Sequence, residues 1–544
     1  MKLINSKKII YIILSIILLI SFGVRVYKVS EIPPAISWDE AANGYNAYTI
    51  ANWGRDEWGN FLPSSFKSFG DDKGPVHIYI TSIFVKIFDL SEFSIRLPAA
   101  FIGTLNVLLL FLLGRIFFSS NLAALIAAGF LAISPYAIQF SRFNHELQFT
   151  IFFFMGGLWL FFVSLDDKGK TYLPAGRFLI LSFLSFGISI LSYHAAKVVV
   201  PVMVFFLITF YFKELWKIKI YFFYAVITLT LLLSIIFFNP ALIGISRFEQ
   251  TTTKLDEIKA TDTYKKTGNI ILGRLEIMGN FYLAHFAPEY LFISGDPIPR
   301  HSIQSVGMFY PVDALFIFIG LVGLIFKKSR ITLLLLLWIL ISPVPATTSG
   351  GANGWGHAGR AMFMVGSWHL IAAYGFYLLI IFFKKKYLRV AVFLIGFLVL
   401  GFFFKNYLYQ YYNNYSKESA IEWQYGMKQI VDYIKENPGY HTVFMTDIRS
   451  QPYIFFLFYL KTPLPHFLET VNYNRSATRP SNLVASFDKY IFADWDPIES
   501  YPYPNVLYIV GPSHYDGLRY QKRFIVKKRV LFPNGLDAFF IVSQ

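Results

Sequence analysis

Four short clusters of ionisable residues in the 544-residue chain have types and spacings that could carry chemistry. The first is Trp38-Asp39-Glu40, where adjacent carboxylates could activate an acceptor hydroxyl as a base or bind a metal ion. A structural alternative has Asp39 as the N-cap of a helix that begins at Glu40. The residues alone leave both interpretations open.

The second cluster is Asp71-Asp72-Lys73-Gly74-Pro75, which comes just before an apolar segment. Pro75 suits the first turn of a helix, and Lys73 would oppose the helix dipole there. A bound phosphate would use both the lysine and the free N–H groups of that turn. The alternative interpretation is an ordinary charged turn.

The third cluster, residues 141–146, ends at Glu146, which opens an otherwise apolar run. Ionisable residues at membrane depth are costly and usually functional. Glu146 could instead cap the dipole of the following helix. Arg142 belongs to the same cluster and is a further candidate.

The fourth cluster is basic: Arg300-His301, together with His357 and Arg360 in the glycine-rich segment 350–360. Arginine binds phosphate through paired hydrogen bonds, and glycines let a loop approach a ligand closely. His194 lies beside Tyr193 and near Lys197, although a lone histidine is more often structural. The chain contains neither a GxxxxGK[ST] phosphate loop nor an HExxH motif.

The composition indicates which elements must position these clusters. Hydrophobic residues make up 55% of the chain and charged residues 15%, against roughly 45–50% and about 25% in soluble domains. This excludes a soluble globular protein and a disordered chain. The absence of cysteine excludes disulfides, thiol nucleophiles and thiolate metal sites. We therefore expect a mainly α, polytopic membrane protein.

Eleven segments are long and apolar enough to predict transmembrane helices, since a span needs about 20 such residues. They are residues 9–29, 97–114, 121–138, 147–165, 178–193, 198–212, 220–238, 307–326, 331–345, 361–383 and 387–404. Residues 76–90 are apolar but short and carry charges, which favours a helix lying on the membrane surface.

The basic residues predict the sidedness of these spans. With 76–90 on the surface, one set of connections holds 17 Lys and Arg, including Lys168 and Lys170, against three acidic residues. The positive-inside rule then places the N-terminus in the cytoplasm and the C-terminus outside. This accounts for nearly all of the net charge of +16, so the charge gives no support to nucleic-acid binding.

Two long loops, 30–96 and 239–306, and the tail 405–544 are then expected outside the cytoplasm. The tail combines a helical pattern at 419–437 with β-type runs at 442–446 and 506–510. This alternation predicts a small α/β domain. We expect a transmembrane domain over 1–404 and an extracytoplasmic α/β domain over 405–544.

At these residues the chain resembles the GT-C superfamily of polyprenyl-phosphate-sugar-dependent glycosyltransferases. It is most similar to the protein O-mannosyltransferase and lipid A aminoarabinose transferase branch. The resemblance rests on WDEA at 38–41, DDKGP at 71–75, RLP at 96–98, SPYAIQFSRFNHE at 134–146, GDPIPRHS at 295–302 and GWGHAGRAMF at 354–363. Position 74 is Gly where many relatives have Pro.

The resemblance implies a role for each matching residue. Asp39 would be the catalytic carboxylate, with Glu40 its neighbour, and Glu146 stands where relatives often carry Asp. Lys73 would contact the donor phosphate. Further phosphate or acceptor contacts would come from Arg96, Arg300, His357 and Arg360, with Asp72, His301, Arg142 and His194 as other candidates. Asp39, Glu40 and Glu146 could hold a divalent ion through oxygen ligands, and the resemblance leaves this open because metal dependence varies across the superfamily.

The implied activity transfers a sugar from a polyprenyl-phosphate donor to a hydroxyl of a lipid, a glycan or a protein, with inversion at the anomeric carbon. It would take place on the outer face of the cell membrane. One alternative is a transporter or flippase of lipid-linked sugars, which usually has polar residues at the membrane midplane and broken helices. Another is a ligase that joins lipid-linked glycans. The sequence leaves the sugar and the acceptor open.

Overall fold

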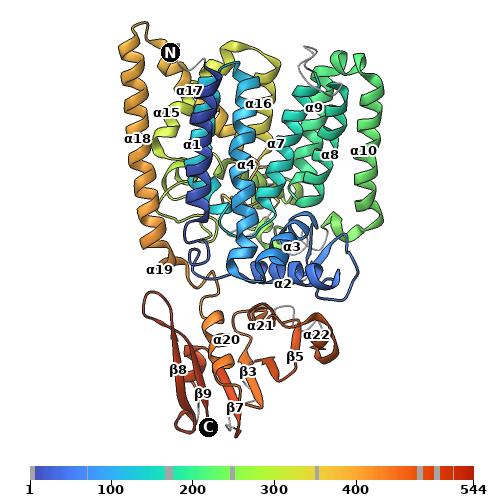
Figure 1. The fold of residues 1–544 in the computed structure, drawn as a ribbon, viewed down its shortest axis with the longest axis vertical. Coiled ribbons are helices and arrows are strands. Elements are labelled where there is room, and N and C mark those ends of the chain that lie inside the picture. Colours follow the sequence, from blue (N-terminus) through green and yellow to red (C-terminus); the bar gives the residue numbers. More distant parts are fainter. Residues whose placement is uncertain are drawn as a thin grey trace. The chain divides into compact units, whose positions relative to one another are not determined.

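The computed structural model describes residues 6–69, 71–165, 175–244, 252–348, 355–474, 482–494, 503–518 and 520–544 (Figure 1). Its contacts divide the chain into two compact units. The helical unit comprises Met1–Tyr27, Ala99–Arg142 and Glu146–Gln410. The α/β unit comprises Lys28–Pro98, Phe143–His145 and Tyr411–Gln544, so the predicted first loop groups with the tail.

Long apolar helices build the helical unit, and all eleven predicted segments lie in helices. These helices are α1 (Lys7–Val26), α4 (Glu92–Phe118), α5 (Asn121–Ile133), α6 (Pro135–Phe140), α7 (Leu147–Ser164), α8 (Ala175–Ser192), α9 (Ala196–Lys217), α10 (Lys219–Phe238), α15 (Pro311–Lys327), α16 (Arg330–Ile341), α17 (Met364–Phe382) and α18 (Lys386–Asn413). The predicted segment 121–138 is two helices, because Ser134 ends α5 and its hydroxyl caps α6 at Ala137.

Seven helices in the described part of the chain are long and apolar enough to cross a membrane: α1, α4, α7, α9, α10, α17 and α18. Predicted loop two is not irregular throughout, since it contains α12 (Leu255–Lys259), α13 (Asp262–Thr267) and α14 (Ile270–Ala284). The number of spans and their sidedness stay predictions.

Glycines allow two of the long helices to pack backbone against backbone. A Cβ on Gly320 of α15 would lie 2.1 Å from the carbonyl oxygen of Ile371 in α17. A Cβ on Gly375 of α17 would similarly meet the carbonyl oxygen of Phe316 in α15. Small residues serve such close approach in membrane helices. Any larger residue at either position would force α15 and α17 apart.

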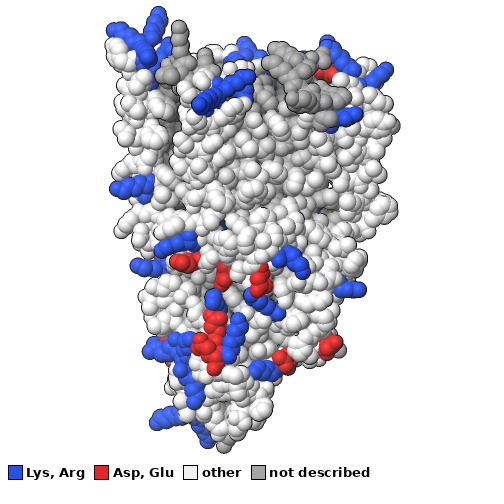
Figure 2. Space-filling model, viewed as in Figure 1, with Lys and Arg blue, Asp and Glu red and all other residues white. Residues whose placement is uncertain are grey.

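Basic residues gather at one end of the helical unit. They lie at the start of α1, the end of α4, the α9–α10 junction, the α15–α16 junction and the α17–α18 junction. Figure 2 shows these Lys and Arg along one edge of a broad band that is almost free of charge. The described residues counted for the predicted cytoplasmic side therefore share one end, and Lys2, Lys168 and Lys170 lie outside the described residues.

The α/β unit is built on a seven-stranded sheet with the order β4-β5-β6-β3-β7-β9-β8. The strands are β3 (Thr442–Thr446), β4 (Asn472–Tyr473), β5 (Val484–Phe487), β6 (Tyr490–Ala493), β7 (Val506–Val510), β8 (Ile525–Leu531) and β9 (Asp537–Ser543). Strand β3 pairs in parallel with β6 and β7, and the other pairs are antiparallel. The predicted runs at 442–446 and 506–510 are the central strands β3 and β7.

Short helices accompany this sheet: α19 (Tyr415–Ser419), α20 (Met427–Glu436), α21 (Pro452–Leu460), α22 (Leu464–Thr470) and α23 (Pro512–Asp516). The prediction of one helix over 419–437 was wrong in its first part. Gly426 has a φ of +110°, which an α-helix cannot include, so α20 begins only at Met427.

The same unit contains α2 (Trp38–Trp53), α3 (Val76–Phe88) and the antiparallel hairpin of β1 (Phe66–Ser68) and β2 (Asp71–Lys73). One hydrophobic core joins residues of α2 and α3 to residues of α20, α21 and the sheet. Gly44 of α2 lies against the ring of Phe458 in α21, where a Cβ would come within 2.6 Å. The Tyr45 hydroxyl donates to the carbonyl of Thr462 at 2.9 Å. These contacts fix α2, which carries the first acidic cluster.

Candidate active site

Helix α2 begins at a capping box, not at Asp39. Ser37 is the N-cap and its hydroxyl accepts the N–H of Glu40, while the Glu40 carboxylate accepts the N–H of Ser37. This pattern satisfies two otherwise unpaired donors of the first turn. The prediction that Asp39 could cap the helix was therefore wrong, because Asp39 lies within the first turn and its side chain is not needed there.

Glu40 and Arg96 form a wholly buried ion pair, with both side chains at 0% exposure. Arg96 donates from Nε and one terminal nitrogen to the two Glu40 oxygens at 2.8 and 2.9 Å. Its other N–H groups donate to the carbonyl oxygens of Val29, Pro33 and Ala35. All five guanidinium donors are therefore engaged. Arg96, predicted as a phosphate contact, has no N–H left for a ligand in this structure.

Asn144 adds a further support to Glu40. Its backbone N–H donates to Glu40 Oε1 at 3.0 Å, and its side-chain amide donates to Thr81 of α3 and to the carbonyl of Ile95. The carboxylate of Glu40 thus accepts four hydrogen bonds. In the sequence Asn144 stands out only as part of a motif, because its partners are about 50 to 100 residues away.

Asp39 contacts Lys73, which brings the first two predicted clusters together. Lys73 Nζ lies 2.5 Å from Asp39 Oδ1 and 3.3 Å from Asn43 Oδ1. The ammonium group has three donors, so one N–H has no partner among the described residues. The Lys73 side chain is 10% exposed and that of Asp39 is 31% exposed. A pair that is ordered and still accessible can meet a substrate.

The β1–β2 hairpin sets the position of Lys73. In its register Phe66 lies opposite Lys73, and Phe66 is fully buried in the core of the α/β unit. Asp72, the neighbouring candidate, lies opposite Lys67 and accepts a long hydrogen bond from Ser65 at 3.5 Å. Burial, with help from Asp71, raises the pKa of Asp72. The second cluster is thus part of a strand, and the charged-turn interpretation was wrong.

A second buried carboxyl group, Glu57, lies near the same lysine and was missed in the sequence. Glu57 is 1% exposed, and its backbone N–H donates to Asn46 Oδ1 at 2.9 Å. Asn46 lies on the face of α2 that carries Asp39 and Asn43, at a spacing of four and then three residues. Burial first and Asp56 second raise the pKa of Glu57 to about 8, although Tyr453 and Lys73 oppose the shift.

Three other predicted residues, Arg142, Glu146 and His194, belong to the helical unit. Arg142 is fully buried and donates to the carbonyl oxygens of Val24, in the last turn of α1, and of Tyr27, the C-cap of α1. Glu146 is the N-cap residue of α7, but its side chain makes no capping hydrogen bond. The ring nitrogen Nδ1 of His194 lies 2.9 Å from Lys197 Nζ, three residues further on. Arg142 and His194 thus have structural partners in this unit.

The predicted basic cluster forms in the helical unit, around an aspartate that the sequence analysis did not single out. Asp296 is fully buried, and its Oδ2 lies 2.7 Å from His301 Nδ1. The rings of His301 and His357 have centroids 4.8 Å apart. His357 Nδ1 accepts the backbone N–H of Arg360 at 3.2 Å, and the carbonyl of Arg300 accepts a bond from Gln139.

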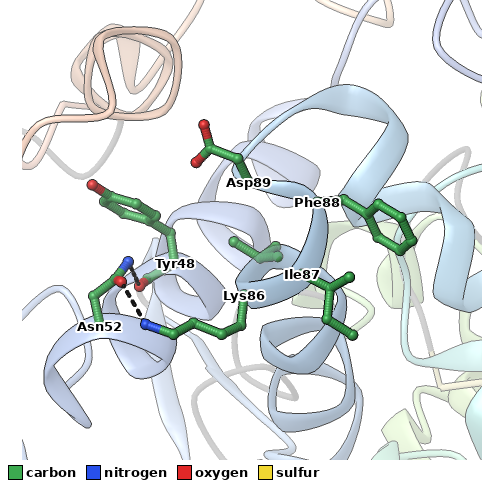
Figure 3. Close-up of a pocket in the computed structure, with 7 residues that line it drawn as sticks. Tyr48, Asn52, Lys86, Ile87, Phe88 and Asp89 are labelled. Atoms are coloured by element: carbon green, nitrogen blue, oxygen red, sulfur yellow. Dashed lines mark hydrogen bonds between the residues drawn. The ribbon is translucent and has the colours of Figure 1, made fainter.

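A surface pocket of the α/β unit, with a volume of about 570 Å³, contains none of the predicted site residues. It lies between the end of α2 and the end of α3, and Tyr48, Asn52, Lys86 and Asp89 are among its lining residues. Figure 3 shows Lys86 reaching to the Asn52 side chain, at a distance of 3.2 Å. Asp89 pairs with Lys461. These polar groups hold one another, so we do not assign the pocket to the site.

Comparison with known proteins supports this view of the fold. A family model described as dolichyl-phosphate-mannose-protein mannosyltransferase matches residues 72–240, which include Lys73 and Arg96. YkcB of Bacillus subtilis (strain 168), a proposed mannosyltransferase, is 29% identical over 179 residues. Those residues are 32% of this chain and 24% of YkcB, so the match spans about a quarter of that relative.

Two solved structures share the arrangement of helices. ArnT from Cupriavidus metallidurans, with undecaprenyl phosphate bound, aligns over 99% of this chain and 98% of its own length, with a TM-score of 0.56 and 13% identity. The chain has the GT-C fold. The oligosaccharyltransferase AglB from Archaeoglobus fulgidus, with an inhibitory peptide and a dolichol-phosphate, aligns over 83% of this chain and 64% of its own length. Its TM-score is 0.50 and its identity 16%.

The GT-C fold and its long apolar helices make this chain a multi-pass membrane protein. Asp39 and Glu40, expected as ligands of a divalent ion, have other partners in this structure. Lys73 places an ammonium 2.5 Å from Asp39, and Glu40 is saturated by four hydrogen bonds. The group of the described residues that could hold a metal ion is Asp296, His301 and His357, whose ligand atoms lie within 4.8 Å of one another.

Proposed function

We propose that this protein is a membrane glycosyltransferase that moves a sugar from a polyprenyl-phosphate donor to an acceptor hydroxyl. The acceptor would belong to a lipid, a glycan or a protein. The observation that carries the proposal is the accessible Asp39–Lys73 pair, 2.5 Å apart and anchored on α2. The family match and the lipid phosphates bound in ArnT and AglB support a donor of this class.

In this proposal Asp39 is the general base. The acceptor oxygen attacks the anomeric carbon of the sugar, and its proton passes to the Asp39 carboxylate. The bond between the anomeric carbon and the phosphate oxygen breaks, and its electron pair stays on the departing lipid phosphate. A single displacement of this kind inverts the configuration of the anomeric carbon. Asp39 contributes an accessible oxygen at the N-terminal end of a helix whose position the core fixes.

Lys73 has two roles in the proposal, and both follow from its contacts. Its bonds to Asp39 and Asn43 hold the ammonium in place, and its remaining N–H is available to a phosphate oxygen. A fixed ammonium stabilises the charge that develops on the leaving phosphate. When a phosphate binds, it shares the positive charge with Asp39, and this weakens the Asp39–Lys73 ion pair. Donor binding would thereby make Asp39 a better base.

We propose that Glu40 and Arg96 act through position, without touching the substrate. Their buried pair and the Asn144 contact fix the first turn of α2. Arg142 would likewise hold the C-terminal end of α1. Other candidates for donor or acceptor contacts lie in the helical unit, namely Glu146, Arg300, His357 and Arg360. Less direct roles would fall to His301, Asp72 and His194. No step in this mechanism requires a metal ion.

The proposal places the protein in the cell membrane, with the N-terminus in the cytoplasm and the domain over 405–544 outside. Lipid-phosphate donors serve where nucleotide sugars are absent, which fits the absence of a GxxxxGK[ST] loop. A flippase of lipid-linked sugars is the second candidate, and a glycan ligase is the third. The ionisable residues lie at helix ends and not at the membrane midplane, which favours an enzyme over a flippase.

The test uses purified protein in lipid nanodiscs with a panel of polyprenyl-phosphate-linked sugars and extracts that contain lipid, glycan and protein acceptors. The proposal predicts acceptor-dependent release of free polyprenyl phosphate, together with a glycosylated product. A flippase would instead move the intact donor between the leaflets of a liposome without release. A ligase would release the lipid only when the acceptor is a second lipid-linked glycan. Movement without release would overturn the proposal.

A further inference from the structure

Two segments of the helical unit, far apart in sequence, bring three metal-binding side chains together. Asp296 and His301 lie in the segment 294–302, and His357 lies just before α17. One ligand atom from each residue falls within 4.8 Å of the others. Two ligands on one tetrahedral zinc ion, each at about 2.0–2.2 Å, lie about 3.5 Å apart. The two imidazoles of His301 and His357 are therefore close enough to share one ion after side-chain adjustments of roughly an ångström.

Backbone hydrogen bonds fix this cluster in advance. Asp296 Oδ1 accepts the N–H of Ile298 at 2.7 Å, and Oδ2 accepts the N–H of Ala358 at 2.6 Å. The same carboxylate therefore joins the two segments. The Tyr136 hydroxyl of α6 donates to the carbonyl of Ala358 at 2.6 Å. The three side chains thus stand on an ordered framework, which a binding site needs.

The Asp296–His301 contact has the form found around histidines that bind metals. His301 Nδ1 donates to the buried Asp296 carboxylate, so Nε2 carries the lone pair. In metal sites such a carboxylate fixes the ring and raises the basicity of the ligating nitrogen. His357 brings a second imidazole to a centroid distance of 4.8 Å. His357 Nδ1 also accepts the backbone N–H of Arg360, through a long bond of 3.2 Å that a metal ion could replace.

We propose that His301 and His357 bind a zinc-class divalent cation, with Asp296 as the carboxylate that orients His301. Imidazole ligands favour Zn²⁺, Co²⁺ or Ni²⁺ over Mg²⁺ and Ca²⁺, which prefer oxygen. Water completes the coordination shell. The ion would fasten the segment 294–302 to the segment before α17. This assignment does not depend on the proposed glycosyltransferase function.

The test measures metal content and affinity in full-length protein purified through a tag without histidine. After chelator treatment and dialysis against zinc, we expect about one equivalent of bound zinc by elemental analysis. His301→Gln and His357→Gln should each lose it, whereas Asp296→Asn should weaken binding about 10–100-fold. His441→Gln is the control, since His441 is exposed in the α/β unit. Retention of zinc by both histidine variants, or an adventitious ion only, would overturn the proposal.

A second measurement uses only the wild-type protein, so it tests the proposal even if the variants fail to fold. Cobalt added to the metal-free wild-type protein should give a visible absorption band that zinc removes with a stoichiometry of about one. Zinc should also raise the temperature at which the wild-type protein unfolds, because an ion that binds only the folded state stabilises it. The absence of both effects in folded wild-type protein would contradict the site directly, whatever the activity assay shows.

Discussion

Replacing Glu57 with glutamine should change how the stability of the α/β unit depends on pH. Glu57 is buried, and Tyr453 is a distant donor to Oε1, at 3.4 Å. Its Oε2 has no hydrogen-bond partner among the described residues. Burial, reinforced by Asp56, raises the pKa of Glu57 from 4.5 to about 8. The neutral acid is therefore the form that the folded protein prefers, and glutamine copies its shape without ionising.

Whether a rise in pH stabilises or destabilises the protein depends on which state, folded or unfolded, holds the proton. Between pH 4.5 and 8 the folded protein keeps the proton on Glu57, while the unfolded chain loses it. The stability contributed by this proton is therefore fully present below pH 4.5 and is lost as the pH rises through 8. At about 1.4 kcal/mol per pH unit, the whole loss is roughly 5 kcal/mol. Over the accessible range from about pH 5.5 to 8, we expect a loss of about 3 kcal/mol.

The assay follows thermal unfolding of wild-type protein and Glu57→Gln in detergent across that pH range, with hydrogen exchange reporting on α2 and α21. The difference in melting temperature between the two proteins should change steadily with pH, in favour of the glutamine variant at high pH. For a unit of this size it should change by about 6–12 °C in total. Glu469→Gln, an exposed acid on α22, serves as the control. Parallel curves for wild type and Glu57→Gln would refute a buried, protonated Glu57.

Three further predictions concern the candidate site and the topology. Lys73→Met should lower the rate of sugar transfer about 100-fold or more, whereas Lys73→Arg keeps a cation and should lose less; equal losses would show that the charge is irrelevant. Glu40→Gln and Arg96→Met should each destabilise the protein by about 3–5 kcal/mol, because each leaves a buried partner unpaired. In calorimetry or thermal scans the double variant should lose much less stability than the sum of the two single losses. Additive losses would show that Glu40 and Arg96 do not stabilise each other. Reporters fused after Lys328 and at the C-terminus should give cytoplasmic and external signals respectively, and the reverse pattern would invert the topology.

The helices of this protein follow from local patterns, and so the sequence predicts them well. Runs of apolar residues mark the long segments, and short β-type runs mark β3 and β7. The predictions from sequence fail where tertiary contacts or single backbone angles determine where a helix begins or ends. Gly426 interrupts the predicted helix over 419–437, and Ser134 divides another predicted segment in two.

The residue types also predicted where chemistry could occur, but not which side chains would be free for it. Asp39 and Lys73 were both singled out, yet their separation of 34 positions gave no indication of their contact. Arg96 looks like a phosphate ligand in the sequence, and only the structure shows its five donors in use. Asp296 and Glu57 were missed because burial, which distinguishes them, is a property of the folded chain. The Asp296-Pro297 pair, a common turn signal, was the one local hint.

The central claim is that Asp39 accepts the acceptor proton during transfer from a lipid-phosphate donor. The most direct measurement is the initial rate of polyprenyl phosphate release by wild-type protein and Asp39→Asn in nanodiscs, at saturating donor and acceptor. Asp432→Asn, an exposed aspartate paired with Lys428, is the matched control. We expect Asp39→Asn to fold, to bind donor and to lose activity by about 10²–10⁴-fold. A rate within about twofold of the wild-type rate, in folded protein, would contradict it.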